Sequence, residues 1–371
     1  MRQLTFPSSR RDFLRGTATV GAGALLGSFA GCAAAAGDQR PADLIVHHAR
    51  ITTLDPDRRE ANAFAVRDGR FVAVGDEADV MRLRGPDTRV VDADNRRVIP
   101  GLIDSHLHII RGGLNFNLEL RWDGVTSLAD AMSMLRAQAL RTPPPQWVRV
   151  VGGFNEYQFR ERRLPTLAEL NAAAPDTPVF VLHLYDRALL NRAALRAVGY
   201  TKDTPTPPGA FVERDSNGEP TGLLVAKPNA FLLYKTLSLG PKLGGDDQRN
   251  STRHFLREVN RLGVTSVVDA GGGFQNYPED YQVIEDLHRR GELTVRIAYN
   301  LFAQKPNEEL ADFRRWVAMV KPGQGDAFYR HNGAGENLVA AAADFEDFLE
   351  PRPDLPERLE EQLHRVVALL S

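Results

Sequence analysis

One stretch constrains this chain more than any other: residues 98 to 109, Val-Ile-Pro-Gly-Leu-Ile-Asp-Ser-His-Leu-His-Ile. Its run of Val, Ile and Leu is typical of a buried strand, and the strand ends in His106 and His108. Side chains two apart on a strand point to the same side, so both imidazoles are expected to project into one space. Neutral imidazole is a common metal ligand, and nitrogen donors suit zinc. The stretch predicts a metal-binding strand end, the alternative being two polar residues near water.

The same residues also carry a family resemblance. Pro100 to His108, Pro-Gly-Leu-Ile-Asp-Ser-His-Leu-His, resembles the first-strand signature of the amidohydrolase superfamily. Residues 152–156 and 163–170 resemble its N-substituted formamide deformylase-like (YtcJ-like) branch, with Phe154 where Trp is usual. The resemblance implies hydrolysis of a non-peptide C–N bond in a small-molecule amide or formamide, through water activated by zinc or another divalent metal, as one or two ions.

Composition narrows the choice of function. The chain has 371 residues, of which 43% are hydrophobic and 25% charged, a globular balance. The net charge of -2 favours neither nucleic acid nor an anionic membrane surface as a partner. Cys32 is the sole cysteine, so an intrachain disulfide is excluded and a zinc site would use histidines and carboxylates.

The N-terminus is expected to be an export signal. Residues 8–15, Ser-Ser-Arg-Arg-Asp-Phe-Leu-Arg, resemble a twin-arginine signal, and a weakly apolar, uncharged stretch follows to residue 36. Its glycines disfavour the alternatives, a buried helix or a membrane anchor. We therefore assign residues 1–36 to export, to the periplasm or cell envelope. Phe-Ala-Gly-Cys at 29–32 resembles a lipoprotein box, so Cys32 could carry a lipid anchor; cleavage after Ala33 to Ala36 is the alternative.

Two structural parts are expected beyond the signal. Residues 43–100 contain short strand-like runs, two of them joined by Asp68-Gly69, a strong hairpin signal. The resemblance implies that they form the first part of a composite β-sandwich. Residues 101–371 alternate strands and helices, which favours a parallel sheet. The predicted fold class is therefore α/β: a (β/α)8 TIM-type barrel, incomplete here, with a small N-terminal β-sandwich.

Two histidines do not complete a catalytic metal site, which wants three protein ligands and an open position. The resemblance implies a bridging carboxylate, often a carbamylated lysine, and two residues qualify. Glu336 follows a glycine-rich stretch that permits close approach, whereas Lys321 lies in a Pro-Gly loop that looks exposed. We favour Glu336. Asp104, two residues before His106, is predicted to orient one of the ligating imidazoles without binding the metal itself.

Other polar residues have a plainer interpretation beside a functional one. Asp269 ends a predicted strand and either faces the site or caps a helix or loop. His331 either reaches substrate or is a polar surface residue. His183 ends an apolar strand and is expected to be a core histidine rather than a ligand. His47 and His48 are expected to be solvated turn residues.

The family pattern calls for two further histidines and an aspartate as general base on later strands. These are expected beyond residue 371, since the sequence matches about five of eight barrel strands, which suggests a truncated chain. Three functions stay open: an amide or formamide hydrolase, a catalytically incompetent remnant of one, or a cyclic-amide or imidazolone hydrolase. The oligomeric state is not predicted.

Overall fold

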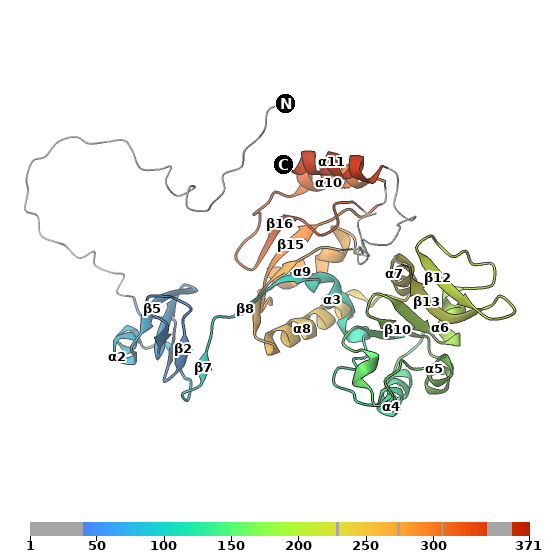
Figure 1. Cartoon of the computed structure of the whole chain (residues 1–371). Helices are drawn as coiled ribbons and strands as arrows, with labels where there is room; N and C mark the ends of the chain where they lie inside the picture. Colours follow the sequence, from blue (N-terminus) through green and yellow to red (C-terminus); the bar gives the residue numbers. More distant parts are fainter. Residues whose placement is uncertain (1–39, 228–229, 273–274, 306, 340–357) are drawn as a thin grey trace, which may run out of the picture. The chain divides into compact units, whose positions relative to one another are not determined.

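The computed structural model describes residues 40–227, 230–272, 275–305, 307–339 and 358–371 (Figure 1). The expected export signal, with Cys32, lies outside the described residues. The chain divides into two compact units between Pro100 and Gly101, and each is described by itself. In the described part of the chain, no helix has the length and apolar character needed to cross a membrane.

The first unit consists of short strands in two sheets, ordered β5-β4-β1-β6 and β3-β2-β7. The elements are β1 (Leu44–His47), β2 (Arg50–Thr52), β3 (Glu60–Ala61), β4 (Ala63–Arg67), β5 (Arg70–Gly75), α2 (Glu77–Val80), η1 (Met81–Leu83), β6 (Arg89–Asp92) and β7 (Arg97–Val98). Asp68 and Gly69 both have positive φ, as the tight turn between β4 and β5 requires. The predicted hairpin is confirmed, and the sandwich arrangement stays a prediction.

The second unit contains a fully parallel sheet in the order β16-β15-β14-β8. Its strands are β8 (Leu102–Leu107), β14 (Val264–Asp269), β15 (Arg296–Leu301) and β16 (Tyr329–Ala334). The helices between and after them are α3 (Ile109–Asn115), α8 (Gly245–Arg261), α9 (Gln282–Arg289), α10 (Glu309–Met319) and α11 (Leu359–Leu370), with η4 (Glu279–Tyr281) before α9. Because parallel strands share a direction, their carboxyl ends meet at one edge of the sheet.

The sheet has four parallel strands among the described residues, not the expected five. The buried strand over residues 179–183 is not part of this sheet. It pairs in parallel with residues 148–151 and antiparallel with residues 187–190. It belongs to a mixed sheet in the order β12-β13-β11-β10-β9. Its strands are β9 (Val148–Val151), β10 (Val179–His183), β11 (Arg187–Leu190), β12 (Ala210–Arg214) and β13 (Pro220–Ala226). A complete barrel stays a prediction.

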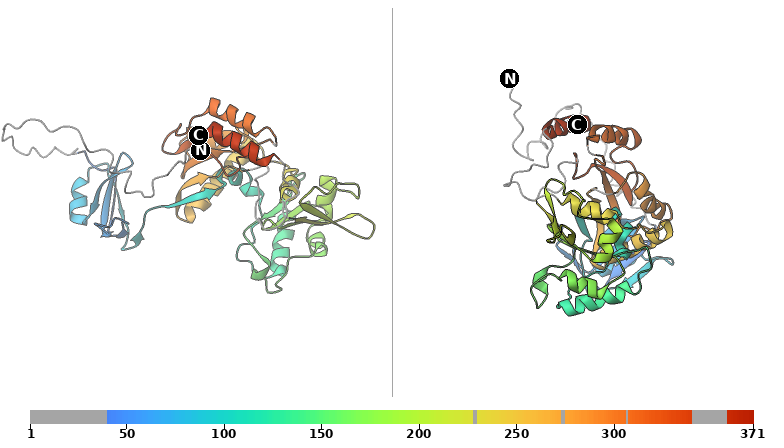
Figure 2. Two further views of the ribbon diagram at one scale, coloured as in Figure 1. Left: turned by 45° about the horizontal axis from the view of Figure 1, so that its top comes forward. Right: turned by 90° about the vertical axis from the view of Figure 1, so that its right-hand side faces the viewer.

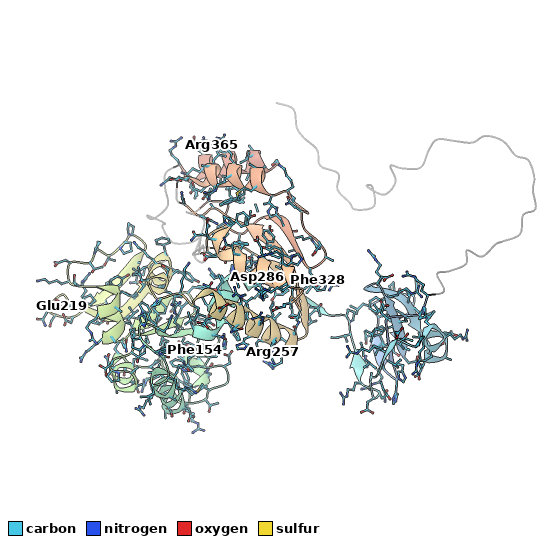
Figure 3. All side chains as sticks on the ribbon, turned by 180° about the vertical axis from the view of Figure 1, so that it is seen from behind. Phe154, Glu219, Arg257, Asp286, Phe328 and Arg365 are labelled. Atoms are coloured by element: carbon cyan, nitrogen blue, oxygen red, sulfur yellow. The ribbon has the colours of Figure 1, made fainter. Side chains whose placement is uncertain are left out.

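The mixed sheet has its own helices and apolar cores. These helices are α4 (Leu128–Ala139), η3 (Glu156–Gln158), α5 (Leu167–Ala173), α6 (Arg192–Val198) and α7 (Phe231–Ser238), whereas η2 (Phe116–Leu118) contacts α3 and α8. Phe154, labelled in Figure 3, is buried there with its ring 4.9 Å from that of Trp122. The phenyl ring at the position where Trp is usual is therefore a core side chain.

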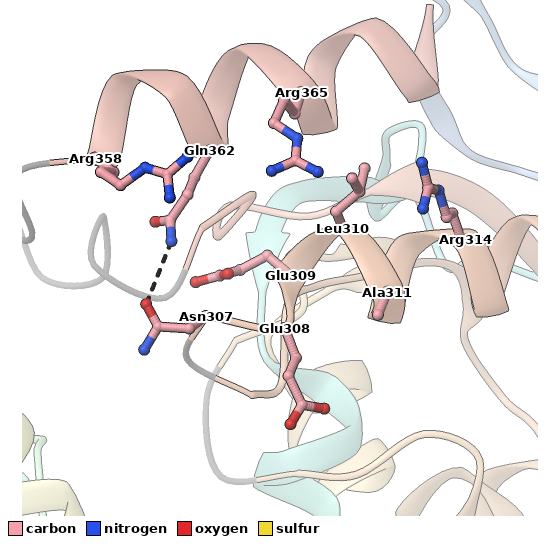
Figure 4. A pocket seen from close by; sticks show the side chains of 9 residues that line it. All are labelled: Asn307, Glu308, Glu309, Leu310, Ala311, Arg314, Arg358, Gln362 and Arg365. Carbon is pink, nitrogen blue, oxygen red and sulfur yellow. Dashed lines mark hydrogen bonds between the residues drawn. The ribbon is translucent and has the colours of Figure 1, made fainter.

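Helix α11 lies beside α10 at the end of the described chain (Figure 2). A polar pocket of about 520 Å³ opens between them, lined in part by Arg314, Arg365 and Glu308 (Figure 4). Gln362 donates a hydrogen bond to Asn307 across it, over 3.3 Å. Neither His106 nor His108 lines this pocket.

Candidate metal centre

The two histidines of the opening motif lie at the carboxyl end of β8. His106 is in the strand with 63% of its side chain exposed, and His108 directly precedes α3 as its N-cap residue. Their ring centroids are 5.6 Å apart and the ring planes are nearly perpendicular. The alternation of the strand therefore brings both imidazoles into one space, as the spacing predicts.

Glu336 meets both imidazoles from the end of β16. One carboxylate oxygen lies 2.9 Å from His106 Nε2, and the other lies 3.5 Å from His108 Nε2. One donor atom from each of the three residues falls within 4.8 Å of the others, the arrangement needed to hold an ion. Glu336 follows His108 by 228 residues in the sequence, so only the fold brings it to the two histidines.

Helix α3 fixes the position of His108 by packing closely on α8. Gly112 lies against the ring of Phe255, and Gly113 lies against Thr252, with too little room for a Cβ at the first of these. The Gly113 carbonyl also accepts a hydrogen bond from Ser251 Oγ over 2.6 Å. The glycine pair after the histidine motif is thus explained by helix packing.

A backbone carbonyl determines which nitrogen of His108 carries the proton. His108 Nδ1 is hydrogen-bonded to the Gly271 oxygen, and because a carbonyl can only accept, Nδ1 must be the donor. Burial lowers the pKa of His108 to about 4, and the charges of Arg111 and His106 act in the same direction. The ring is therefore neutral near pH 7, which leaves an unshared electron pair on Nε2.

The donor atoms of this cluster and their spacing are compatible with a bound divalent cation. The Nε2 electron pair of His108 faces a Glu336 oxygen 3.5 Å away with no proton to share between them. Two ligands about 2.0–2.1 Å from a tetrahedral zinc are about 3.3 Å apart, close to both distances measured here. Two imidazoles and one carboxylate are also donors that zinc takes in proteins.

The other two candidates of the metal site lie differently. The carboxylate of Asp104 accepts the backbone N–H of His106 over 3.0 Å, so it holds the strand end and does not contact an imidazole nitrogen in the described hydrogen bonds. Lys321 is exposed, and its ammonium donates to the Val317 carbonyl at the end of α10. The structure thus brings Glu336 to the histidines and leaves Lys321 apart from them.

The remaining polar residues serve the fold. Asp269 is fully buried and accepts the backbone N–H groups of Ile110 and Gly271, so it caps a helix start and a loop. His331 is buried beside the ring of Tyr299, so a polar surface position is wrong. His183 is buried, and both of its ring nitrogens are hydrogen-bonded to carboxylates: Nδ1 to Asp186 over 2.7 Å and Nε2 to Glu156 over 2.8 Å.

The adjacent histidines of the first unit, His47 and His48, do not contact a common carboxylate. His47 pairs with Glu77 and His48 with Asp92, each over 2.9 Å. His48 is half exposed and His47 is less so. His47 ends β1 and His48 follows in the bend, so the expected turn position holds for His48 alone, and the two rings contact different carboxylates.

Sequence reasoning missed the backbone that lines the site. Gly272 has φ of +118°, and a Cβ there would come 2.9 Å from His108 Cε1 and 3.0 Å from Glu336 Oε1. Gly271 supplies the carbonyl for His108. The run of three glycines after Asp269 was the available signal, because repeated glycine at a strand end indicates close approach of backbone.

Comparison with known proteins agrees with the fold and the motif. The model of the amidohydrolase family matches residues 89–371, and that of the TAT (twin-arginine translocation) pathway signal sequence matches residues 7–27. A metal-dependent hydrolase of unknown function from Pyrococcus horikoshii OT3 superposes with a TM-score of 0.52 at 19% identity, over 76% of this chain and 52% of that one. That similarity concerns the fold alone.

Two curated relatives carry names that bear on chemistry. The N-substituted formamide deformylase of Arthrobacter pascens is 34% identical over 185 residues, which are 49% of this chain and 34% of that protein. The amidohydrolase YtcJ of Bacillus subtilis (strain 168) is 31% identical over 191 residues, 51% of this chain and 36% of that protein. The matched part is about a third of each relative's length. Since the family match covers most of the sequence, the chain belongs to the amidohydrolase family.

Proposed function

We propose that this chain belongs to a metal-dependent hydrolase that cleaves a non-peptide carbon–nitrogen bond of a small amide, with N-substituted formamides as the first substrate class to test. The observation that carries the proposal is the convergence of His106, His108 and Glu336 within 4.8 Å. The relative named N-substituted formamide deformylase supports the substrate class. A zinc ion, or a pair of divalent ions, is the proposed cofactor.

The residues of the site would divide the work as follows. His106 and His108 would hold an ion through Nε2, and Glu336, with one oxygen toward each ring, would share one ion or bridge two. A divalent ion bound there polarises a carbonyl and lowers the pKa of water. The Gly271 carbonyl keeps the proton of His108 on Nδ1, so that Nε2 stays free to bind.

Asp269 is not proposed as the general base. Its side chain is fully buried and each of its oxygens accepts a backbone N–H, so it has no surface from which to contact a reacting group. Burial raises its pKa to about 6, with the bound amides and Arg111 acting against this.

Hydrolysis of a simple N-alkyl formamide by the zinc-loaded full chain tests the proposal. Formate and amine should be released in equal amounts. Glu336→Gln should lower the rate at least 100-fold, because it replaces the shared carboxylate with an uncharged amide. Glu308→Gln is the matched control, since Glu308 is an exposed loop acid paired only with Lys305 at 3.4 Å in the described contacts. Zinc-loaded wild type that releases no formate, or equal rates for the two variants, would reject it. Turnover of a cyclic amide instead would move the substrate class to ring amides.

We further propose that the chain reaches the periplasm or the outer side of the cell membrane, with Cys32 as a lipid attachment site. The twin-arginine signal over residues 7–27 supports export. Replacing Arg10 and Arg11 by lysine should leave the protein in the cytoplasm, whereas Arg15→Lys should not. Cys32→Ser should release an exported protein from the membrane fraction; if wild type is already free of membrane, cleavage after Ala33 to Ala36 is the better assignment.

A further inference from the structure

Asp269 joins two parts of the chain that surround the metal-site histidines. It lies at the end of β14 with none of its surface exposed. Its Oδ2 accepts the backbone N–H of Ile110, in the first turn of α3, over 2.9 Å. Its Oδ1 accepts the backbone N–H of Gly271, in the following loop, also over 2.9 Å. One buried carboxylate therefore fixes the start of α3 and the glycine loop together.

The two residues after Asp269 contact the segments of all three proposed ligands. The Ala270 N–H donates to the carbonyl of Leu107, which lies between His106 and His108, over 3.0 Å. The Ala270 carbonyl accepts the backbone N–H of Glu336 over 2.9 Å. The Gly271 carbonyl accepts the Nδ1 proton of His108. The placement of residues 269–271 thus sets the relative positions of the ligands.

We propose that Asp269 is a positioning residue of the metal centre, which holds the Gly271 carbonyl on His108 Nδ1 and thereby keeps the Nε2 electron pair directed at Glu336. This inference rests on the proposed metal-dependent function. It assigns a role to the tautomer of His108 that can be measured without any metal present. Asp269 is fully buried and both of its oxygens are hydrogen-bonded to backbone N–H groups, so the proposed effect is exerted through the backbone.

A carboxylate is specifically suited to this task. Each backbone N–H needs an acceptor, and an ionised carboxyl group has an acceptor on both sides. An asparagine has the same shape but only one oxygen, so its amide N–H would face one of the two buried N–H groups. Asp269→Asn should therefore displace either Gly271 or Ile110 without creating a cavity.

Asp312 offers a matched control away from the metal site. It too is buried, and its Oδ2 accepts the backbone N–H groups of Gln304 and Lys305, over 2.9 and 3.0 Å, in the loop after β15. Asp312→Asn makes the same chemical change at a buried site of the same unit and should also destabilise the fold, because its amide nitrogen would face the Arg315 guanidinium that now donates to Oδ1 over 3.4 Å. A difference between the two variants in the metal site is then not a result of lost stability.

The experiment measures two properties of the full chain as wild type, Asp269→Asn and Asp312→Asn at pH 8. The first is the 15N spectrum of histidine-labelled, metal-free protein, in which protonated and unprotonated ring nitrogens have distinct shifts; His108→Gln assigns the signal. The second is the zinc dissociation constant by calorimetric titration. If Asp269→Asn does not fold, Asp269→Ser, which keeps one acceptor oxygen in a smaller side chain, takes its place.

The inference predicts that wild type and Asp312→Asn show His108 protonated on Nδ1, whereas Asp269→Asn shows a mixture of the two tautomers. Zinc binding should weaken about 10- to 100-fold in Asp269→Asn, as is typical when a partner behind a metal ligand is lost, and less than twofold in Asp312→Asn. An unchanged His108 signal in Asp269→Asn would overturn the inference, and so would equal zinc affinities in the two variants. If wild type binds no zinc, the proposed function fails, while the tautomer comparison still decides the role of Asp269.

Discussion

At the level of single residues, the position of one proton decides what the donor set can bind. His108 donates a hydrogen bond from Nδ1–H to the Gly271 carbonyl, so its Nε2 faces Glu336 as an electron-pair donor. His106 meets the other oxygen of the same carboxylate. The cation proposed for this site would take an electron pair from each of the three side chains.

Adding a methyl group at Gly272 should disturb this donor set directly. Gly272→Ala places a Cβ 2.9 Å from His108 Cε1 and 3.0 Å from Glu336 Oε1, at a φ of +118° that alanine disfavours. We expect the zinc dissociation constant to rise at least tenfold in a calorimetric titration. Gly291→Ala is the control, because it has a positive φ but no atom within 4 Å of its Cβ. Equal zinc affinities in the two variants would contradict the geometry described here.

A buried acid outside the metal site should make stability depend on pH. Burial raises the pKa of Glu119 to about 7 from its usual 4.5, although Arg121 and Arg149 act against this. Between these two pH values the folded chain binds more protons than the unfolded chain, so stability falls as pH rises. Relative to Glu119→Gln, the free energy of unfolding of wild type should drop by up to ~3 kcal/mol between pH 4 and 8 in urea titrations. Parallel curves for the two proteins would exclude the raised pKa.

Residue pattern, together with the bridging carboxylate that the family resemblance implies, was enough to predict part of the site. Histidine two residues from histidine at a strand end, and a glutamate after glycines, are patterns visible in the sequence, and the structure brings these three side chains together. The Gly271 carbonyl could not be predicted, since every residue has a carbonyl and only the fold selects one. For the same reason Asp104, next to the motif, looked like the partner of an imidazole, whereas it binds a backbone amide.

At the level of helices and strands, the sequence predicts a helix start best where a capping side chain marks it. Serine and asparagine are residue types that favour a helix start, and Ser127 and Asn191 each accept a backbone N–H from the first turn of their helix. Strand β16 was missed because Tyr-Arg-His-Asn-Gly-Ala is too polar and too rich in glycine to indicate a strand. Helix α3 was missed because it has seven residues and two glycines, and its stability comes from packing on α8.

The N-cap of α4 provides a test of these local rules. Ser127 Oγ accepts the backbone N–H of Asp130 over 3.1 Å, which satisfies a donor that the helix leaves free. Ser127→Ala should lower the free energy of unfolding by about 1 kcal/mol. Ser133→Ala, at an exposed position inside the same helix, should leave it unchanged or raise it slightly, because alanine favours helix. Chemical denaturation of both variants checks this, and equal losses would exclude a capping role.

At the level of the whole molecule, the alternation of strands and helices predicted the α/β class, and the parallel order of β8, β14, β15 and β16 agrees with it. The second sheet could not be predicted, because a buried strand such as β10 has the same apolar sequence in a parallel or a mixed sheet. Which sheet it joins depends on β11, whose four residues, Arg-Ala-Leu-Leu, carry no strand signal.

The most direct test is the zinc content of the purified full chain after saturation and removal of free metal. We expect at least one zinc per chain in wild type and none in the double variant His106→Ala, His108→Ala. The control is His47→Ala, His48→Ala, which removes two neighbouring histidines that also contact carboxylates but share no donor set; it should keep its zinc. Folded wild type without zinc, or zinc that stays when His106 and His108 are replaced, would contradict the proposed metal centre.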